Sequence, residues 1–170
     1  LTMQIKQYKM FESVLIINRG EIALRILRTL KSIGIKSYSV FSEQDKDSYH
    51  LELSDYIYPL KGNSAKETYL NQDQLIDIIN KTQCEAVHPG YGFLSENHEF
   101  AKRVQQETKA KFIGPTPETI KLLGSKIDSR NLMIANNIPV LPGSSSPIKS
   151  ITELKQLAQN IGYPLMLKAS

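Results

Sequence analysis

The chain carries the segment His-Pro-Gly-Tyr-Gly-Phe-Leu-Ser-Glu-Asn at residues 88–97, between a short apolar run and a stretch with helical periodicity. Ala86 and Val87, just before it, have the size and β-branching of a buried strand end, and Asn97 is a residue type that caps helices. The glycines therefore lie at a strand-to-helix crossover, which is where open α/β sheets bind ligands.

Strand-like apolar runs alternate with helix-like periodic segments in the rest of the chain. We expect strands at residues 14–17, 36–41, 56–58, 86–88 and 111–113. We expect helices at residues 22–33, 71–80, 100–107 and 126–136, with Gly34 ending the first, and a short helical turn at 50–53. This alternation predicts an α/β fold whose largely parallel sheet is covered by helices on both faces.

The composition changes after Gly124, and residues 138–147 contain too many helix and strand breakers for regular structure. A domain boundary is therefore expected near this connector. Beyond it, Thr152 is predicted to cap a helix that ends at Gly162, and residues 165–167 are predicted to be a strand that opens a second domain. We expect the chain to be a piece of a longer polypeptide.

Composition excludes several classes of protein. The 170 residues are 41% apolar and 22% charged, which is typical of a globular domain, and no apolar run approaches the roughly 20 residues that span a bilayer. The N-terminal segment lacks the apolar core of a secretory signal. Cys84 is the only cysteine, so it cannot form an internal disulfide, and we expect it to be a small buried apolar group in a reducing compartment.

The net charge of +4 is spread along the chain, with no block of like charges. Aromatic residues are not interleaved with basic ones as they are in single-strand binders, so the charge favours an anionic small ligand over nucleic acid. The helix predicted at residues 22–33 has a basic face formed by Arg25, Arg28 and Lys31.

Five segments together resemble the N-terminal part of the biotin carboxylase family, in the same order and spacing, from about Phe11 to the last residue. They are residues 18–26, 88–97, 112–115, 139–143 and 162–170. The resemblance implies a Rossmann-like pre-ATP-grasp domain with a parallel sheet at residues 11–124. It further implies a linker and the start of an ATP-grasp domain at residues 125–170.

The resemblance also implies a reaction. ATP activates bicarbonate as carboxyphosphate, and the carboxyl group passes to a ureido nitrogen of biotin on a carrier domain, while Mg²⁺ neutralises phosphate charge. The implied partners are the biotin carboxyl carrier domain, a carboxyltransferase domain or subunit, and a second copy of the chain, which the helix with Arg25 and Arg28 would approach. Nucleic acid and membranes are not among them, and the implied compartment is the cytoplasm or the mitochondrial matrix.

The resemblance assigns ATP binding to Lys168 and Lys126. Lys168 closes the apolar run 165–167, where a charge is costly to bury unless a phosphate pairs with it; the alternative is an ammonium that reaches solvent at a strand end. The family usually has an acidic residue before the second lysine, whereas this chain has Ser125. For Lys126 a solvated lysine in the first helical turn therefore remains open.

Tyr91 corresponds to a tyrosine close to the biotin site of the family. The flanking glycines would let the backbone approach a ligand and leave the ring exposed, while a core aromatic under a glycine-rich turn is the alternative. We expect Glu96 and Asn97 to hold the loop and cap the helix. Arg19 and Glu21 are expected to form a structural network with each other.

Other site chemistries lack support in the sequence. There is no Gly-x-Gly-x-x-Gly and no Gly-x-x-x-x-Gly-Lys-Ser/Thr, so neither a dinucleotide site nor a P-loop is predicted. His88 and His98 lack the spacing of metal ligands, and no third residue orients Cys84 with His88 as a nucleophile. We predict no catalytic residue and no metal ligand within these 170 residues.

Two other functions remain open. Another ATP-grasp ligase would share the two-domain plan, and a scaffold module could keep this surface without the chemistry. A glycine-rich phosphate loop and carboxylates for magnesium after Ser170 would favour the carboxylase. The final acceptor, such as an acyl-CoA, pyruvate or urea, would be chosen by other domains.

Overall fold

The computed structural model of the protein describes residues 11–168. These residues divide into two compact units, with the boundary between Pro117 and Glu118.

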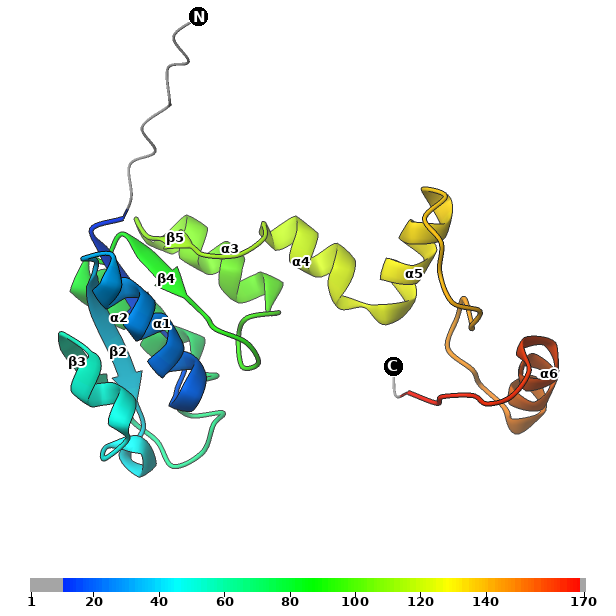
Figure 1. The fold of residues 1–170 in the computed structure, drawn as a ribbon, viewed down its shortest axis with the longest axis horizontal. Coiled ribbons are helices and arrows are strands. Elements are labelled where there is room, and N and C mark those ends of the chain that lie inside the picture. Colours follow the sequence, from blue (N-terminus) through cyan, green and yellow to red (C-terminus); the bar gives the residue numbers. More distant parts are fainter. Residues whose placement is uncertain (1–10, 169–170) are drawn as a thin grey trace, which may run out of the picture. The chain divides into compact units, whose positions relative to one another are not determined.

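The first unit is built on a five-stranded, fully parallel sheet in the order β3-β2-β1-β4-β5 (Figure 1). Its strands are β1 (Ser13–Ile16), β2 (Lys36–Phe41), β3 (Tyr56–Pro59), β4 (Ala86–His88) and β5 (Lys111–Phe112). All five predicted strands are present, with ends displaced by one residue at most. The prediction of an α/β fold with a parallel sheet is therefore confirmed.

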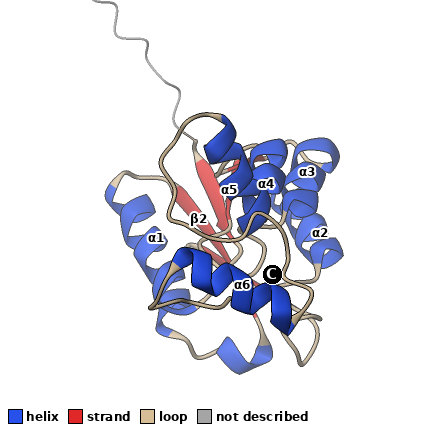
Figure 2. Ribbon diagram, turned by 90° about the vertical axis from the view of Figure 1, so that its right-hand side faces the viewer, coloured by secondary structure: helices blue, strands red, loops and turns tan. Residues whose placement is uncertain are grey.

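Helices cover both faces of this sheet. Figure 2 shows α1 (Gly20–Ser32) on one side of the strands, and α2 (Gln72–Thr82) and α3 (His98–Glu107) on the other. Successive residues of a strand point to opposite faces. Accordingly, Val14 and Ile16 pack with α1, whereas Leu15 packs with α2 and α3. Because both faces of the central strands are buried, β1 and the start of β4 are apolar runs rather than alternating ones.

Local signals begin and end these helices. The side chain of Asn97 accepts a hydrogen bond from the backbone N–H of Phe100 at 2.8 Å, so its predicted role as a cap is confirmed. Asn71 caps α2 in the same way. Gly34 follows α1 with φ of +72°, a conformation that glycine adopts without penalty. Two 3₁₀ helices, Glu43–Asp45 and Tyr49–Leu53, lie between β2 and β3; the second matches the predicted turn.

The second unit contains helices and connecting segments. Its helices are α4 (Pro117–Gly124), which begins at the last residue of the first unit, α5 (Lys126–Ala135) and α6 (Ile151–Ile161). The connector predicted at 138–147 has no helix or strand. We did not predict α4, because two prolines precede its apolar residues; proline nevertheless suits the first position of a helix, where its missing N–H costs nothing.

Two predictions for this unit are wrong. Ser150, not Thr152, caps α6: its hydroxyl accepts from the backbone N–H of Glu153 at 3.1 Å, and Thr152 lies inside the first turn. Residues 165–167 do not form a strand, since a strand requires a neighbouring backbone and no segment within residues 11–168 pairs with them. Among the helices of residues 11–168, none has the length and apolar character needed to cross a membrane.

Candidate functional site

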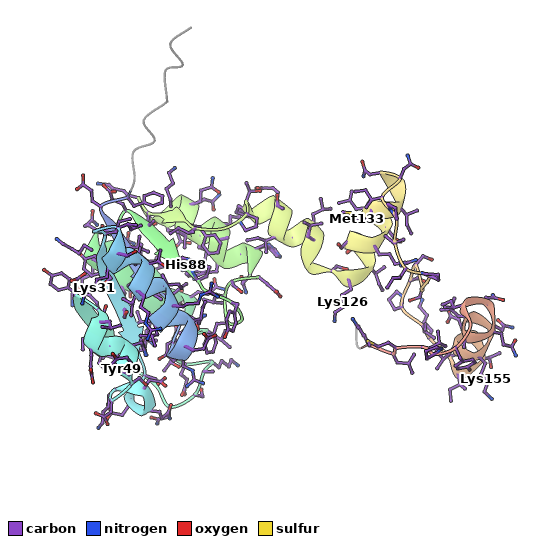
Figure 3. All side chains as sticks on the ribbon, viewed as in Figure 1. Lys31, Tyr49, His88, Lys126, Met133 and Lys155 are labelled. Carbon is purple, nitrogen blue, oxygen red and sulfur yellow. The ribbon has the colours of Figure 1, made fainter. Side chains whose placement is uncertain are left out.

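The sheet has one topological switch point, between β1 and β4. From central β1 the chain proceeds outward through β2 and β3, then returns to place β4 and β5 on the other side. The segments that follow β1 and β4 therefore diverge at the carboxyl ends of the strands, where α/β sheets form their binding crevice. The segment 88–97 begins here, with His88 at the end of β4 (Figure 3).

Asn18 bridges this switch point. The residue is 3% exposed, and its side chain donates through Nδ2 to the carbonyl oxygens of Pro89 at 2.7 Å and Tyr91 at 2.9 Å. Gly90 lies against it with φ of +67°, and a Cβ on this residue would be 2.8 Å from Nδ2 of Asn18. Only glycine fits this position without displacing the amide. The segment after β4 is thus fixed to the segment after β1.

Tyr91 points away from the core. The residue is 60% exposed, and its hydroxyl donates a hydrogen bond to the carboxylate of Glu21 in the first turn of α1. This hydrogen bond, reinforced by the negative charge of Glu21, raises the pKa of Tyr91. The alternative of a core aromatic is therefore wrong, and the phenol is neutral and outward-facing at neutral pH.

Arg19 does not pair with Glu21 as predicted. Its guanidinium forms an ion pair with Asp45, with 3.2 Å between Nη1 and Oδ1, and lies 5.6 Å and 5.8 Å from the ring centroids of Tyr69 and Phe93. The reason is topological: β1 and β2 are neighbours, so Asp45, shortly after β2, comes within reach of the residue that follows β1.

Asp45 organises a polar cluster beside the segment 88–97. Its carboxylate accepts hydrogen bonds from the hydroxyls of Ser42 at 2.7 Å and Tyr69 at 2.8 Å, in addition to the ion pair with Arg19. Burial alone would raise the pKa of Asp45, but these hydrogen bonds and the charge of Arg19 outweigh burial and lower it. Burial, aided by Asp45, raises the pKa of Tyr69 to about 12. At neutral pH the cluster thus pairs the ionised carboxylate of Asp45 with the neutral phenol of Tyr69.

This cluster also holds the loop. The rings of Tyr69 and Phe93 are stacked, with centroids 5.1 Å apart, so the segment 88–97 is anchored by aromatic contact as well as by the amide of Asn18. The sequence did not predict these roles of Asn18, Asp45 and Tyr69, because the contacts that join them to the rest of the site, between Asn18 and Tyr91 and between Asp45 and Tyr69, span 73 and 24 residues of the chain.

His88 and Cys84 have structural roles in the first unit. The Nδ1 atom of His88 accepts from the backbone N–H of Gly90 at 3.0 Å, and burial lowers the pKa of His88, so the ring is neutral. Cys84 is buried, as expected, and burial raises the pKa of its thiol. Within residues 11–168, no three side chains of His, Cys, Asp or Glu are grouped closely enough to hold a metal ion.

Lys126 and Lys168 line one pocket of the second unit. Its walls are Lys126, Ile127 and Arg130 of α5, residues 141–144 and 147–151, one side of α6 and residues 161–168; Figure 3 labels Lys126 at the start of α5. Two ammonium groups from distant parts of the chain suit a polyanion such as a nucleotide phosphate. Lys168 is exposed, so its charge is not buried as the sequence predicts.

Ser125 has a clear local role. Its hydroxyl accepts from the backbone N–H of Asp128 at 3.2 Å and caps α5 directly before Lys126. The serine that stands where the family usually has an acidic residue is therefore a helix cap.

Comparison with known proteins places both units. Residues 10–120 match the family described as the N-terminal domain of biotin carboxylase, and residues 125–170 match the ATP-binding domain of the carbamoyl-phosphate synthase L chain. Biotin carboxylase 2 of Bacillus subtilis is 47% identical over 161 residues, which are 95% of this chain and 36% of that protein. The mitochondrial propionyl-CoA carboxylase alpha chain of Mus musculus is 43% identical over 162 residues, 95% of this chain and 22% of that one.

A solved structure agrees with these relatives. The biotin carboxylase domain dimer of the Hydrogenobacter thermophilus 2-oxoglutarate carboxylase, in complex with MgADP, ADP and bicarbonate, matches with a TM-score of 0.84 and 38% identity. The match covers 92% of this chain and 34% of that one. The chain therefore spans about a third or less of these relatives. With its family match, its sequence identity and its fold, the chain belongs to the biotin carboxylase N-terminal domain family.

Proposed function

We propose that this chain is the N-terminal part of a biotin carboxylase, which uses ATP and bicarbonate to carboxylate protein-bound biotin through carboxyphosphate. The observation that carries the proposal is the geometry of the switch point in a chain that belongs to this family. There the side chain of Asn18 joins the segments after β1 and β4, and Tyr91 is exposed. The relative from Hydrogenobacter thermophilus binds MgADP and bicarbonate, which supports the same substrates here.

The proposal divides the work between two regions. Residues 11–124 are the Rossmann-like domain, in which Tyr91 lies near the biotin site and no residue performs chemistry. Residues 125–170 are the linker and the start of the ATP-grasp domain. Because Tyr91 is neutral and held by two hydrogen bonds, its role is to position biotin rather than to exchange a proton with it.

Lys126 and Lys168 would bind ATP. They line one pocket, which supports their action on a single polyanion. ATP supplies the phosphoryl group that activates bicarbonate, and Mg²⁺ neutralises phosphate charge. Within residues 11–168 no three side chains of His, Cys, Asp or Glu are grouped closely enough to hold a metal ion, and we assign no metal ligand to them.

The partners follow from the same proposal. They are a biotin carboxyl carrier domain, a carboxyltransferase domain or subunit, and a second copy of the chain; Arg25, Arg28 and Lys31 form an exposed basic face on α1 that is available for that copy. Nucleic acid and membranes are not proposed partners. Relatives from a bacterium and from mitochondria support a location in the cytoplasm or the mitochondrial matrix.

The direct test measures ADP release by the full polypeptide that carries this segment. We expect turnover that requires both bicarbonate and biotin, since a different ATP-grasp ligase or a scaffold would not need biotin. ADP release at the same rate with and without biotin would refute the proposal. The 170 residues alone, which span about a third of the bacterial relative, are expected to release no phosphate in response to biotin.

The nucleotide site has its own test. Replacing Lys168 with Met in the full polypeptide should weaken MgATP binding roughly 10- to 100-fold, because a charged hydrogen bond to phosphate is lost. Lys155→Met is the matched control: Lys155 is an exposed lysine on α6 that does not line the pocket (Figure 3). Equal nucleotide affinity in the two variants would exclude the assigned role of Lys168.

A further inference from the structure

Residues 18–21, which follow β1 and enter the first turn of α1, hold both the backbone and the side chain of Tyr91. The amide of Asn18 binds the backbone carbonyl of Tyr91 at 2.9 Å, and Glu21 accepts the hydrogen bond of its phenol. These contacts cross 73 and 70 residues of sequence and join two segments that diverge at the switch point. Backbone and ring are thus fixed by the same short stretch of chain.

The direction of the phenol hydrogen bond matters. A tyrosine hydroxyl has one proton to donate and lone pairs to accept with. Because that proton is engaged by Glu21, the oxygen of Tyr91 meets an incoming ligand only as a hydrogen-bond acceptor. It therefore suits a ligand with an N–H donor and disfavours one that offers only acceptors.

We expect the pair of Glu21 and Tyr91 to contribute little to the stability of the fold. Both Glu21 and Tyr91 are exposed, and exposed pairs contribute little to stability. The buried attachment of the loop rests instead on Asn18 and on the contact between Tyr69 and Phe93. Removing the carboxylate of Glu21 should therefore free the ring of Tyr91 while the loop backbone stays in place.

We propose that Glu21 is a positioning residue for the proposed biotin site: it orients the ring of Tyr91 and leaves the phenolic oxygen as an acceptor for a ureido N–H. This role rests on the proposed carboxylase function. Glu21 touches no reacting atom in this scheme and acts only through Tyr91.

Kinetics of the full polypeptide with free biotin tests the role. Glu21→Ala should raise the KM for biotin roughly 2- to 10-fold, as expected for the loss of one orienting hydrogen bond, with little change in kcat. Glu21→Gln keeps an oxygen acceptor and should restore most of the affinity. Glu99→Ala is the matched control, because Glu99 is likewise an exposed glutamate at the second position of a helix.

A double-mutant cycle tests whether Glu21 acts through Tyr91. On a Tyr91→Phe background, Glu21→Ala should have no further effect on the KM for biotin, because the hydroxyl it orients is gone. Additive effects of the two substitutions would overturn the proposal. So would a KM in Glu21→Ala that changes no more than in Glu99→Ala while biotin-dependent turnover persists.

A spectroscopic readout separates this proposal from the proposed function. In the 170-residue chain labelled with ¹³C at tyrosine Cζ, the Tyr91 signal is assigned by its loss in Tyr91→Phe. Its titration should move to lower pH in Glu21→Ala and not in Glu99→Ala. An unchanged titration in Glu21→Ala refutes the pairing regardless of enzyme activity. If the pKa of Tyr91 falls in Glu21→Ala but turnover of the full polypeptide does not depend on biotin, the pairing of Glu21 with Tyr91 stands. Its role in biotin binding is then overturned.

Discussion

Gly90→Ala tests how tightly the two segments of the switch point are joined. Alanine at this position meets two penalties. A φ of +67° is unfavourable for any residue with a Cβ, and that Cβ would be 2.8 Å from Nδ2 and 3.1 Å from Cγ of Asn18. The amide of Asn18 is buried and donates to two carbonyl groups, so it has little room to retreat.

The size of the effect follows from these two penalties. The left-handed backbone conformation costs alanine about 1–2 kcal/mol. Displacing Asn18 leaves buried polar groups unsatisfied, at about 1–3 kcal/mol. We therefore expect Gly90→Ala to lower the free energy of unfolding by about 2–5 kcal/mol. Gly92→Ala is the control on the same loop: its φ is +66°, but a Cβ there meets nothing within 4 Å, so only the first penalty applies.

Urea unfolding followed by tyrosine fluorescence measures the difference. The chain has no tryptophan, and all but two of its eight tyrosines lie between residues 38 and 91, so the signal reports mainly on the first unit. Adding Asn18→Ala to each glycine variant makes room for the Cβ, and the two variants should then lose similar stability. If Gly90→Ala costs no more than Gly92→Ala in the presence of Asn18, the close approach does not limit the loop.

Three further substitutions test other contacts of the first unit. Asn97→Ala should lower its unfolding free energy by about 1 kcal/mol through loss of the α3 cap, and Asn97→Asp should restore most of it, as the urea midpoint will show; equal losses would contradict a capping role. Because the pKa of Tyr69 is raised to about 12, its contribution to the free energy of unfolding is fully present below about pH 10 and is lost as pH rises toward 12. Stability measured by circular dichroism should therefore fall less steeply at alkaline pH in Tyr69→Phe than in the unaltered chain. An identical fall would refute the raised pKa of Tyr69. Burial lowers the pKa of His50, whose ring nitrogens have no hydrogen-bond partner within residues 11–168. Its contribution to the free energy of unfolding is therefore present above about pH 6.5 and is lost as pH falls. His50→Gln should reduce this loss of stability at acid pH, and an unchanged dependence of stability on pH would exclude His50 as its source.

The strands and helices of the first unit could be predicted because their signals are local. The apolar run of β1 and the cap at Asn97 each act within a few residues, and the structure keeps them where the sequence predicts. The same holds for the parallel arrangement, since consecutive strands joined by helices leave few other topologies. Residues 165–167 show the limit of such reasoning, because an apolar run becomes a strand only beside another strand.

The contacts of the site were less predictable because they depend on which loops the topology brings together. Arg19 and Glu21 are two residues apart and of opposite charge, so a mutual network was a reasonable expectation. In the structure each has a distant partner instead, Asp45 for Arg19 and Tyr91 for Glu21. Only the strand order, with β2 and β4 on either side of β1, explains why neighbours in sequence turn to opposite sides.

The strand order also explains why this crevice differs from a dinucleotide site. In such sites a glycine-rich turn lets the pyrophosphate approach the N-terminus of the first helix. Here the side chain of Asn18 crosses between the segments after β1 and β4, and Glu21 places a negative charge in the first turn of α1, where it would repel phosphate. The switch point thus holds Tyr91 outward, and we propose that a nucleotide phosphate binds instead at Lys126 and Lys168, which line one pocket of the second unit.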